Sequence, residues 1–333
     1  MTTPLRFIPD DAKRWNDSQG RPIAVVEVTI RTIQGRFLLA PTERNKSLIL
    51  GVLGRALKCY DFELYGYAFL SNHGSMLIGV QSAPHLSQIM QHIHSNIARE
   101  LGRREQSDWN ARFWQRRGRA ILVLTDEDLQ ARMKYLLANS TKEGLVSQPT
   151  RWPGAHCAQA LCFDKPDVGA WVDRTRLGVL RRAARSKTGR KSRISEGCAT
   201  DWLPVKLTQL PCWTDLPRPQ YRQEIRELCG QIEQEATAER AETGREVVGV
   251  KHLRRVDPHH RPEHLETSPA PPVHCRDPDL RHGFLVAYRW FVDAYRAAFR
   301  YLRAKLCAQA RWPLEDQGFP PGGVVPGAVG AVA

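Results

Sequence analysis

The chain has 333 residues, enough for one large or two ordinary domains, and its 49 Lys and Arg against 35 Asp and Glu leave a net charge of +14 at pH 7. This excess favours a polyanionic partner, either nucleic acid or an anionic membrane. No apolar run approaches the ~20 residues of a membrane-spanning helix, and the N-terminus lacks the pattern of a secretion signal. We therefore expect a cytoplasmic protein with no membrane partner. The 8 cysteines include no Cys-x-x-Cys pair, which argues against a zinc knuckle or a disulfide framework.

The first half of the chain alternates between strand and helix patterns after a polar start that we expect to be frayed over residues 1–20. Runs of β-branched residues predict strands, and apolar residues at a spacing of three and four predict amphipathic helices. In chain order we predict a strand over 23–39 with a turn at 34–35, a helix over 49–60, two strands within 65–80 with a break near 71–72, a helix over 86–101, a strand over 120–124 and a helix over 125–144.

This order of elements predicts the fold class. Strand, helix, strand, strand, helix, strand is the ferredoxin-like split βαβ arrangement, and one helix is added. We expect an α+β domain over 21–155, with an antiparallel sheet and helices on one face. A basic, mostly helical extension should follow over 156–312, and then a disordered tail over 313–333. The extension includes the run RRAARSKTGRKSR (181–193), with seven basic residues in thirteen, which is either an arm bound to DNA or a solubilising linker.

Two pairs of side chains in the predicted domain are notable for their spacing. His73 and Ser75 lie two residues apart at the start of a strand, so both face the same side of the sheet. Tyr135 and Asn139 lie four apart in a helix and fall together on the flank away from its apolar stripe. A tyrosine and an amide stacked in this way could serve as nucleophile and metal ligand. The alternative is an ordinary half-exposed tyrosine.

The context of these pairs is a family resemblance. The stretch YAFLSNHGSMLIGV (67–80), followed by YLLANSTKEGLV (135–146), resembles the tyrosine-HUH single-strand transposases. The REP-associated tyrosine transposase branch is the closer match, with its Asn-His-hydrophobic-His pattern and later Tyr-x-x-x-Asn. The resemblance covers about residues 20–155. It implies that Tyr135 attacks a DNA phosphodiester to form a 5′-phosphotyrosine link. It also implies that His73 and Asn139 hold a divalent cation, Mg²⁺ or Mn²⁺.

The chain departs from the family pattern at two positions. Asn72, His73, Tyr135 and Asn139 match, but Ser75 stands where the second histidine belongs and Gly74 stands where an apolar residue belongs. Ser75 would still face the metal, and its neutral hydroxyl is a poorer ligand than imidazole. We therefore expect weak metal binding and impaired cleavage, and we expect Ser75→His with Gly74→Val to rebuild the site.

Two further patterns suggest other functions. QHIHS (91–95) contains His-hydrophobic-His, but in a helix His92 and His94 point ~200° apart, so we expect structural or surface roles for both. YGYAFLSN (65–72) matches five defined positions of the RNP1 signature, in which exposed aromatics stack on RNA bases. It lacks the basic first residue and the aromatic last residue of that signature.

Basic residues gather in two clusters that predict a nucleic-acid-binding surface. Trp109, Phe113 and Trp114 are interleaved with these basic residues, and we expect them to stack on bases while arginines neutralise phosphates. We expect the partner to be single-stranded or hairpin DNA, and a homodimer is compatible with the sequence. The alternative is a non-catalytic DNA- or RNA-binding protein of the same fold. The predicted contacts are Arg99, Arg103, Arg104, Arg112, Arg116, Arg117 and Arg119.

Overall fold

A computed structural model of the chain describes residues 6–102, 112–188, 194–262 and 271–310. Among the described residues, those from Arg6 to Leu285 form one compact unit, and those from Val286 onward belong to a second. The boundary falls within helix α8 (Pro278–Ala310), and the described part of the second unit is the portion of this helix from Val286 onward. Within the described residues, no helix has both the length and the apolar character that crossing a membrane requires.

An antiparallel sheet forms the centre of the larger unit. Strand β2 (Pro22–Arg31) lies between β4 (His73–Val80) and β5 (Arg119–Val123), and β3 (Glu63–Phe69) pairs with the outer edge of β4. All three pairings are antiparallel, so the order β3-β4-β2-β5 is the split βαβ order that the sequence predicted. Two short strands extend the sheet, β1 (Trp15–Asn16) on β2 and β8 (Val273–His274), which runs parallel to β5. The α+β fold class is confirmed.

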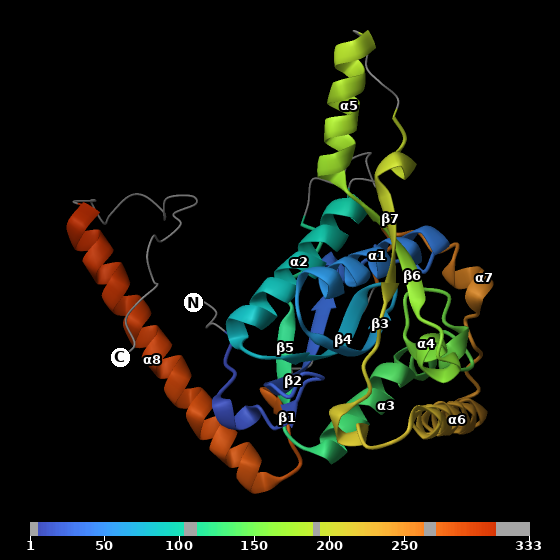
Figure 1. Cartoon of the computed structure of the whole chain (residues 1–333). Helices are drawn as coiled ribbons and strands as arrows, with labels where there is room; N and C mark the ends of the chain where they lie inside the picture. The colour runs from blue at the N-terminus through green and yellow to red at the C-terminus, as the bar shows by residue number, and fades with distance from the viewer. Residues whose placement is uncertain (1–5, 103–111, 189–193, 263–270, 311–333) are drawn as a thin grey trace. The chain divides into compact units, whose positions relative to one another are not determined.

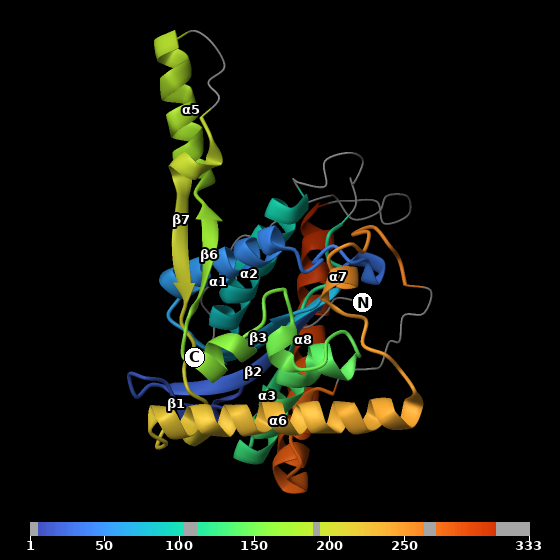
Figure 2. The ribbon, with the colours of Figure 1, turned by 90° about the vertical axis from the view of Figure 1, so that its right-hand side faces the viewer.

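Helices cover both faces of this sheet, whereas the sequence predicted helices on one face. Figures 1 and 2 show α1 (Glu43–Cys59) and α2 (Ala83–Gly102) against one face and α3 (Asp126–Lys142) against the other. The added helix α3 packs closely, since a Cβ placed on Gly66 of β3 would lie 3.2 Å from Cδ2 of Leu136. Thr125 caps α3 by accepting a hydrogen bond from the backbone of Asp128. A sheet covered on both faces explains why β2 is almost continuously apolar.

The first predicted strand is shorter than expected. Strand β2 ends at Arg31, and residues Ile33–Gly35 form a 3-10 turn, η2, in which Gln34 has φ 54° and Gly35 has φ 67°. These left-handed conformations are incompatible with a continuing strand. The turn predicted at 34–35 is therefore confirmed, and the prediction that strand structure continues beyond it over 36–39 was wrong. The other 3-10 turns are η1 (Asp10–Ala12), η3 (Pro149–Arg151), η4 (Glu196–Ala199) and η5 (Pro211–Trp213).

Several elements after α3 pack onto the sheet domain within the larger unit. Strands β6 (Asp167–Val172) and β7 (Thr200–Val205) form an antiparallel pair against α1, with α5 (Arg174–Thr188) inserted between them in sequence. Gly51 and Gly169 permit this contact, because a Cβ on Gly169 would lie 2.0 Å from the Gly51 backbone nitrogen. Helix α6 packs along α3. The remaining helices are α4 (Ala158–Phe163), α6 (Arg218–Thr243) and α7 (Val250–Leu253).

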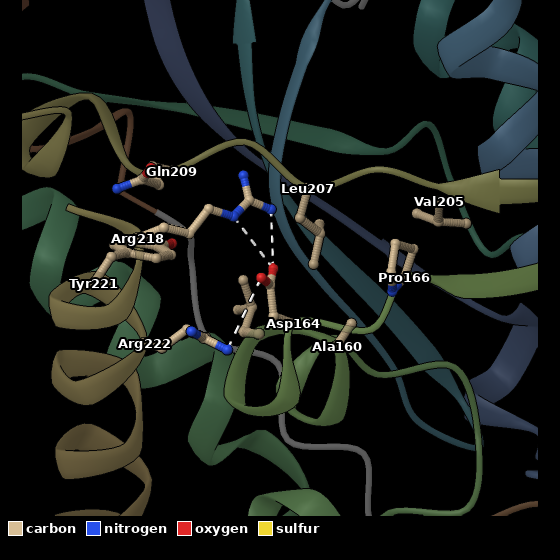
Figure 3. Close-up of a pocket in the computed structure, with 10 residues that line it drawn as sticks. Ala160, Asp164, Pro166, Val205, Leu207, Gln209, Arg218, Tyr221 and Arg222 are labelled. Atoms are coloured by element: carbon tan, nitrogen blue, oxygen red, sulfur yellow. Dashed lines mark hydrogen bonds and ion pairs between the residues drawn. The ribbon is translucent and has the colours of Figure 1, made fainter. Parts of the chain in front are cut away.

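A small pocket lies between α4 and α6. Figure 3 shows Arg218 and Arg222 directed at the carboxylate of Asp164, with Nη2 of Arg218 at 3.0 Å and Nη1 of Arg222 at 3.9 Å. Its volume of about 40 Å³ leaves room for a few waters only. Because both arginines face the carboxylate that ends α4, we assign this pocket a structural role.

Candidate functional site

The face of the sheet that α3 covers carries a row of polar side chains. Alternation along β2 places Glu27, Thr29 and Arg31 on one face. The strand register sets Arg31 opposite His73 and Thr29 opposite Ser75, both on β4. Residues two apart on one strand meet residues two apart on the next, so all of these side chains belong to one surface.

A cleft of about 370 Å³ opens between this surface and α3. Its lining includes His73 and Ser75 from β4 together with Tyr135 and Asn139 from α3. The phenol of Tyr135 is 41% exposed, whereas Ser75 and Asn139 are buried. The structure therefore brings the four side chains singled out by spacing into one cleft, with the tyrosine accessible from solvent.

His73 is held in a defined orientation. Its Nδ1 lies 2.8 Å from Oδ1 of Asn72, so Nδ1 carries the proton and donates to that oxygen, and the lone pair of Nε2 is left available. Burial, together with the positive charge of Arg31, lowers the pKa of His73 to about 4. The ring is therefore neutral at pH 7 and can accept a proton, a hydrogen bond or a cation at Nε2.

The donors in this cleft do not form a tight divalent-metal site. One imidazole, the Ser75 hydroxyl and the Asn139 amide are all neutral, and Nδ2 of Asn139 is buried without a hydrogen-bond partner. Glu27 is the one carboxylate among the described residues that line the cleft, and Arg132 and His274 surround it. Hard cations favour anionic oxygen ligands, and the arginines of the cleft oppose a further positive charge.

Gly74 faces away from the cleft and is in close contact with Phe69. A Cβ on Gly74 would lie 2.5 Å from Cδ1 and Cε1 of the Phe69 ring, which is 1% exposed. This ring occupies the space that an apolar residue at position 74 would fill. The expectation that Gly74→Val helps to rebuild the site was therefore wrong.

Sequence reasoning missed a buried charge cluster beside the tyrosine. Two nitrogens of the Arg132 guanidinium, Nη2 and Nε, lie 3.1 Å from the carboxylate of Glu27, and Nε2 of His274 lies 2.6 Å from the same group. The guanidinium carbon of Arg132 is 4.0 Å from the centroid of the Tyr135 ring. A signal was available, because Glu27 is a carboxylate within the apolar strand VVEVTI and is 3% exposed. A buried carboxylate requires a cationic partner.

The predicted basic contacts divide between two faces of the domain. Arg116, Arg117 and Arg119 line the cleft, where Arg31 and Arg132 join them. Arg99 lies on α2, against the opposite face of the sheet, and Arg112 is exposed outside the lining of the cleft. Arg103, Arg104 and Trp109 lie outside the described residues.

The aromatic residues beside these arginines have a structural role. Phe113 is 8% exposed and packs edge-on against Trp114, with ring centroids 4.7 Å apart. The indole nitrogen of Trp114 donates to the carbonyl of His94 at 2.9 Å. The prediction that Phe113 stacks on bases was wrong, since its ring is buried. The Trp114 ring is half-buried and is held against α2 by its bond to the His94 carbonyl.

The two competing motifs are part of the packed interior. His94 is buried, and burial lowers its pKa to about 3. Tyr65, Tyr67 and Phe69 of the RNP1-like stretch are each at most 1% exposed. Rings buried to this degree cannot stack on RNA bases, which removes the RNP1 interpretation.

No family model and no curated protein matches the chain. Two solved structures are similar to parts of it. One is a REP-associated tyrosine transposase bound to a REP hairpin, with 15% identity over 46% of this chain and 81% of that chain and a TM-score of 0.36. The other is a candidate transposase from Deinococcus radiodurans R1, with 12% identity over 35% of this chain and 90% of that chain and a TM-score of 0.28. Both TM-scores are low, so the fold assignment rests on the strand order and register of the sheet.

Proposed function

We propose that this cleft binds single-stranded or hairpin DNA and that Tyr135 cleaves the strand, as in the tyrosine-HUH transposases that the sequence resembles. One observation carries the proposal. The accessible phenol of Tyr135 shares a cleft with five arginines among the described residues, Arg31, Arg116, Arg117, Arg119 and Arg132. Guanidinium groups bind phosphate through paired hydrogen bonds, so the cleft suits a phosphodiester backbone.

The reaction would be a transesterification. The phenol oxygen of Tyr135 attacks phosphorus, the bond from phosphorus to the 3′ oxygen breaks, and a 5′-phosphotyrosine link forms. The proton lost by the phenol is balanced by the proton gained by the departing 3′ hydroxyl. No water is consumed, so the energy of the phosphodiester is kept for rejoining. The arginines would stabilise the charge that develops on the phosphate oxygens.

Arg132 would position the nucleophile. Its guanidinium lies over the Tyr135 ring at 4.0 Å from the centroid, and it donates a hydrogen bond of 3.1 Å to the carboxylate of Glu27. A cation held against an aromatic face restrains the ring. Lys142 adds a second cation at 5.3 Å from the ring centroid. We infer that this arrangement directs the phenol oxygen toward the cleft.

A divalent cation, Mg²⁺ or Mn²⁺, would have Nε2 of His73 and the Asn139 amide as donors, with the Ser75 hydroxyl as a weak third. In the related transposases such an ion polarises the scissile phosphate. Because the donors here are neutral and the surroundings are cationic, we propose weak binding at most.

The experiment is a search for the covalent product. The full chain is incubated with a 5′- or 3′-labelled hairpin carrying a single-stranded flank, in Mg²⁺ or Mn²⁺, and resolved on a denaturing gel. We expect protein joined to the DNA 5′ end, and Tyr135→Phe should abolish this species while leaving DNA binding nearly unchanged. Tyr301→Phe is the matched control, because Tyr301 is exposed on α8. An adduct that persists in Tyr135→Phe would refute the role of Tyr135.

The second candidate function is non-catalytic binding of folded DNA or RNA. The replacement of the second histidine by Ser75 favours it, because loss of a metal ligand removes activity before it removes the basic cleft. Tight binding to hairpins with no adduct under any metal condition would establish this alternative.

A further inference from the structure

Helix α5 forms an arm that the proposed catalytic cleft does not use. It connects β6 to β7 and extends away from the sheet, as Figures 1 and 2 show. Leu177 near its base is buried, but Val179 is 50% exposed and the residues beyond it are mostly exposed. A helix of 15 residues is roughly 22 Å long, so most of its length contributes little to the core.

The arginines of α5 differ in their ion pairing along the helix. At the base, Arg174 pairs with Glu100 and Glu196, and Arg176 lies 2.9 Å from Asp201. Farther out, Arg182 and Arg185 are exposed, and no carboxylate of the described residues lies within ion-pair distance of either. The sequence from 174 to 195 contains no Asp or Glu.

The outer arginines share one face. At ~100° per residue, Arg181, Arg182 and Arg185 fall within a sector of roughly 100°. The Arg181 guanidinium also donates to the carbonyl of Ile194, at 3.3 Å from Nη2, which holds it near this face. Like charges three and four apart destabilise an isolated helix, and a polyanion laid along the face would relieve that repulsion.

We propose that this face of α5 binds the phosphate backbone of double-stranded DNA, such as the stem of a hairpin whose single-stranded part enters the cleft. The inference rests on the proposed function in taking DNA as the partner. Duplex DNA is favoured over a single strand because α5 has no aromatic residue, and single-strand binding uses aromatic rings on which bases stack. Duplex DNA presents a regular row of phosphates, and its major groove admits an α-helix.

The test compares two probes, a blunt duplex and a single strand of the same length. The variant carries Arg181→Ala, Arg182→Ala and Arg185→Ala, which preserve helix propensity on an exposed face. We expect the slope of log affinity against log salt for the duplex to flatten by about 2.7, or 0.9 for each lost phosphate contact. Single-strand binding should be unchanged, and so should formation of the Tyr135 adduct on a single-stranded probe without a stem. Circular dichroism checks that the variant is folded.

The matched control removes the same charge elsewhere, through Arg245→Ala, Lys251→Ala and Arg255→Ala, all of them exposed residues of the same unit. Its duplex slope should stay near that of the wild type. An unchanged slope in the α5 variant, or equal losses in the control, would overturn the inference. Binding of α5 to phosphatidylserine vesicles without any effect on duplex affinity would also overturn it. If the wild type forms the Tyr135 adduct but binds the duplex independently of α5, this inference fails and the proposed function stands.

Discussion

Removal of the cleft arginines should reduce the salt dependence of single-strand binding by an amount that follows from the structure. Five arginines of the described residues line the cleft. Arg132 is already paired with Glu27, so phosphate contacts are counted for the other four arginines. Each contact with a phosphate of single-stranded DNA adds about −0.7 to the slope of log affinity against log salt, so four contacts predict a slope of about −2.8. Replacing Arg116, Arg117 and Arg119 by alanine leaves one contact and a slope of about −0.7.

These slopes separate clearly in a simple measurement. A fourfold rise in salt should weaken wild-type binding about 50-fold and binding by the triple variant about 3-fold. Fluorescence anisotropy of a labelled single strand, titrated at four or five salt concentrations, gives both slopes. Arg99→Ala is the positional control, because Arg99 lies on α2 against the opposite face of the sheet. Equal slopes for wild type and triple variant, or an equal flattening in Arg99→Ala, would show that the backbone is bound elsewhere.

Three further outcomes are expected near the cleft and in the core. Ser75→His should raise Mn²⁺ affinity by roughly 10-fold or more, because imidazole is the better donor, and isothermal titration calorimetry that shows no gain would contradict a degraded metal site. Gly74→Val should lower the free energy of unfolding by about 1–3 kcal/mol through overpacking against Phe69, and equal stability in urea would contradict that contact. His94 has a folded-state pKa of about 3, below its unfolded value, so the unfolded chain binds more protons as pH falls. Its contribution to stability is therefore complete above pH ~6.5 and is lost toward pH 3, and His94→Gln should weaken this dependence in urea titrations across that range.

Much of the candidate site could be predicted because its spacing is local. A period of two puts His73 and Ser75 on one face of a strand, and a spacing of four puts Tyr135 and Asn139 on one face of a helix. Both predictions need only the geometry of one element. The order of strands and helices similarly predicted a split βαβ core, since few connections are compatible with that order.

What the site contains beyond these pairs was decided by tertiary packing. Glu27 meets Arg132 and His274 across separations of 105 and 247 residues, and β8, which carries His274, is only two residues long. No periodicity reveals so short a strand. The basic residues show the same limit. Arg99 is near the cleft arginines in the sequence, so we predicted that they share one surface, but the sheet lies between Arg99 and the cleft.

The aromatic residues show most clearly that burial of a side chain cannot be predicted from the local sequence alone. Phe113 and Trp114 sit between arginines, so composition alone favoured base stacking, yet the Phe113 ring is buried and the half-buried Trp114 ring is bonded to the His94 carbonyl of α2. An exposed ring and a buried ring have the same local sequence preferences. Which of the two a ring becomes depends on the surface that another element presents to it, and that surface exists only once the chain has folded.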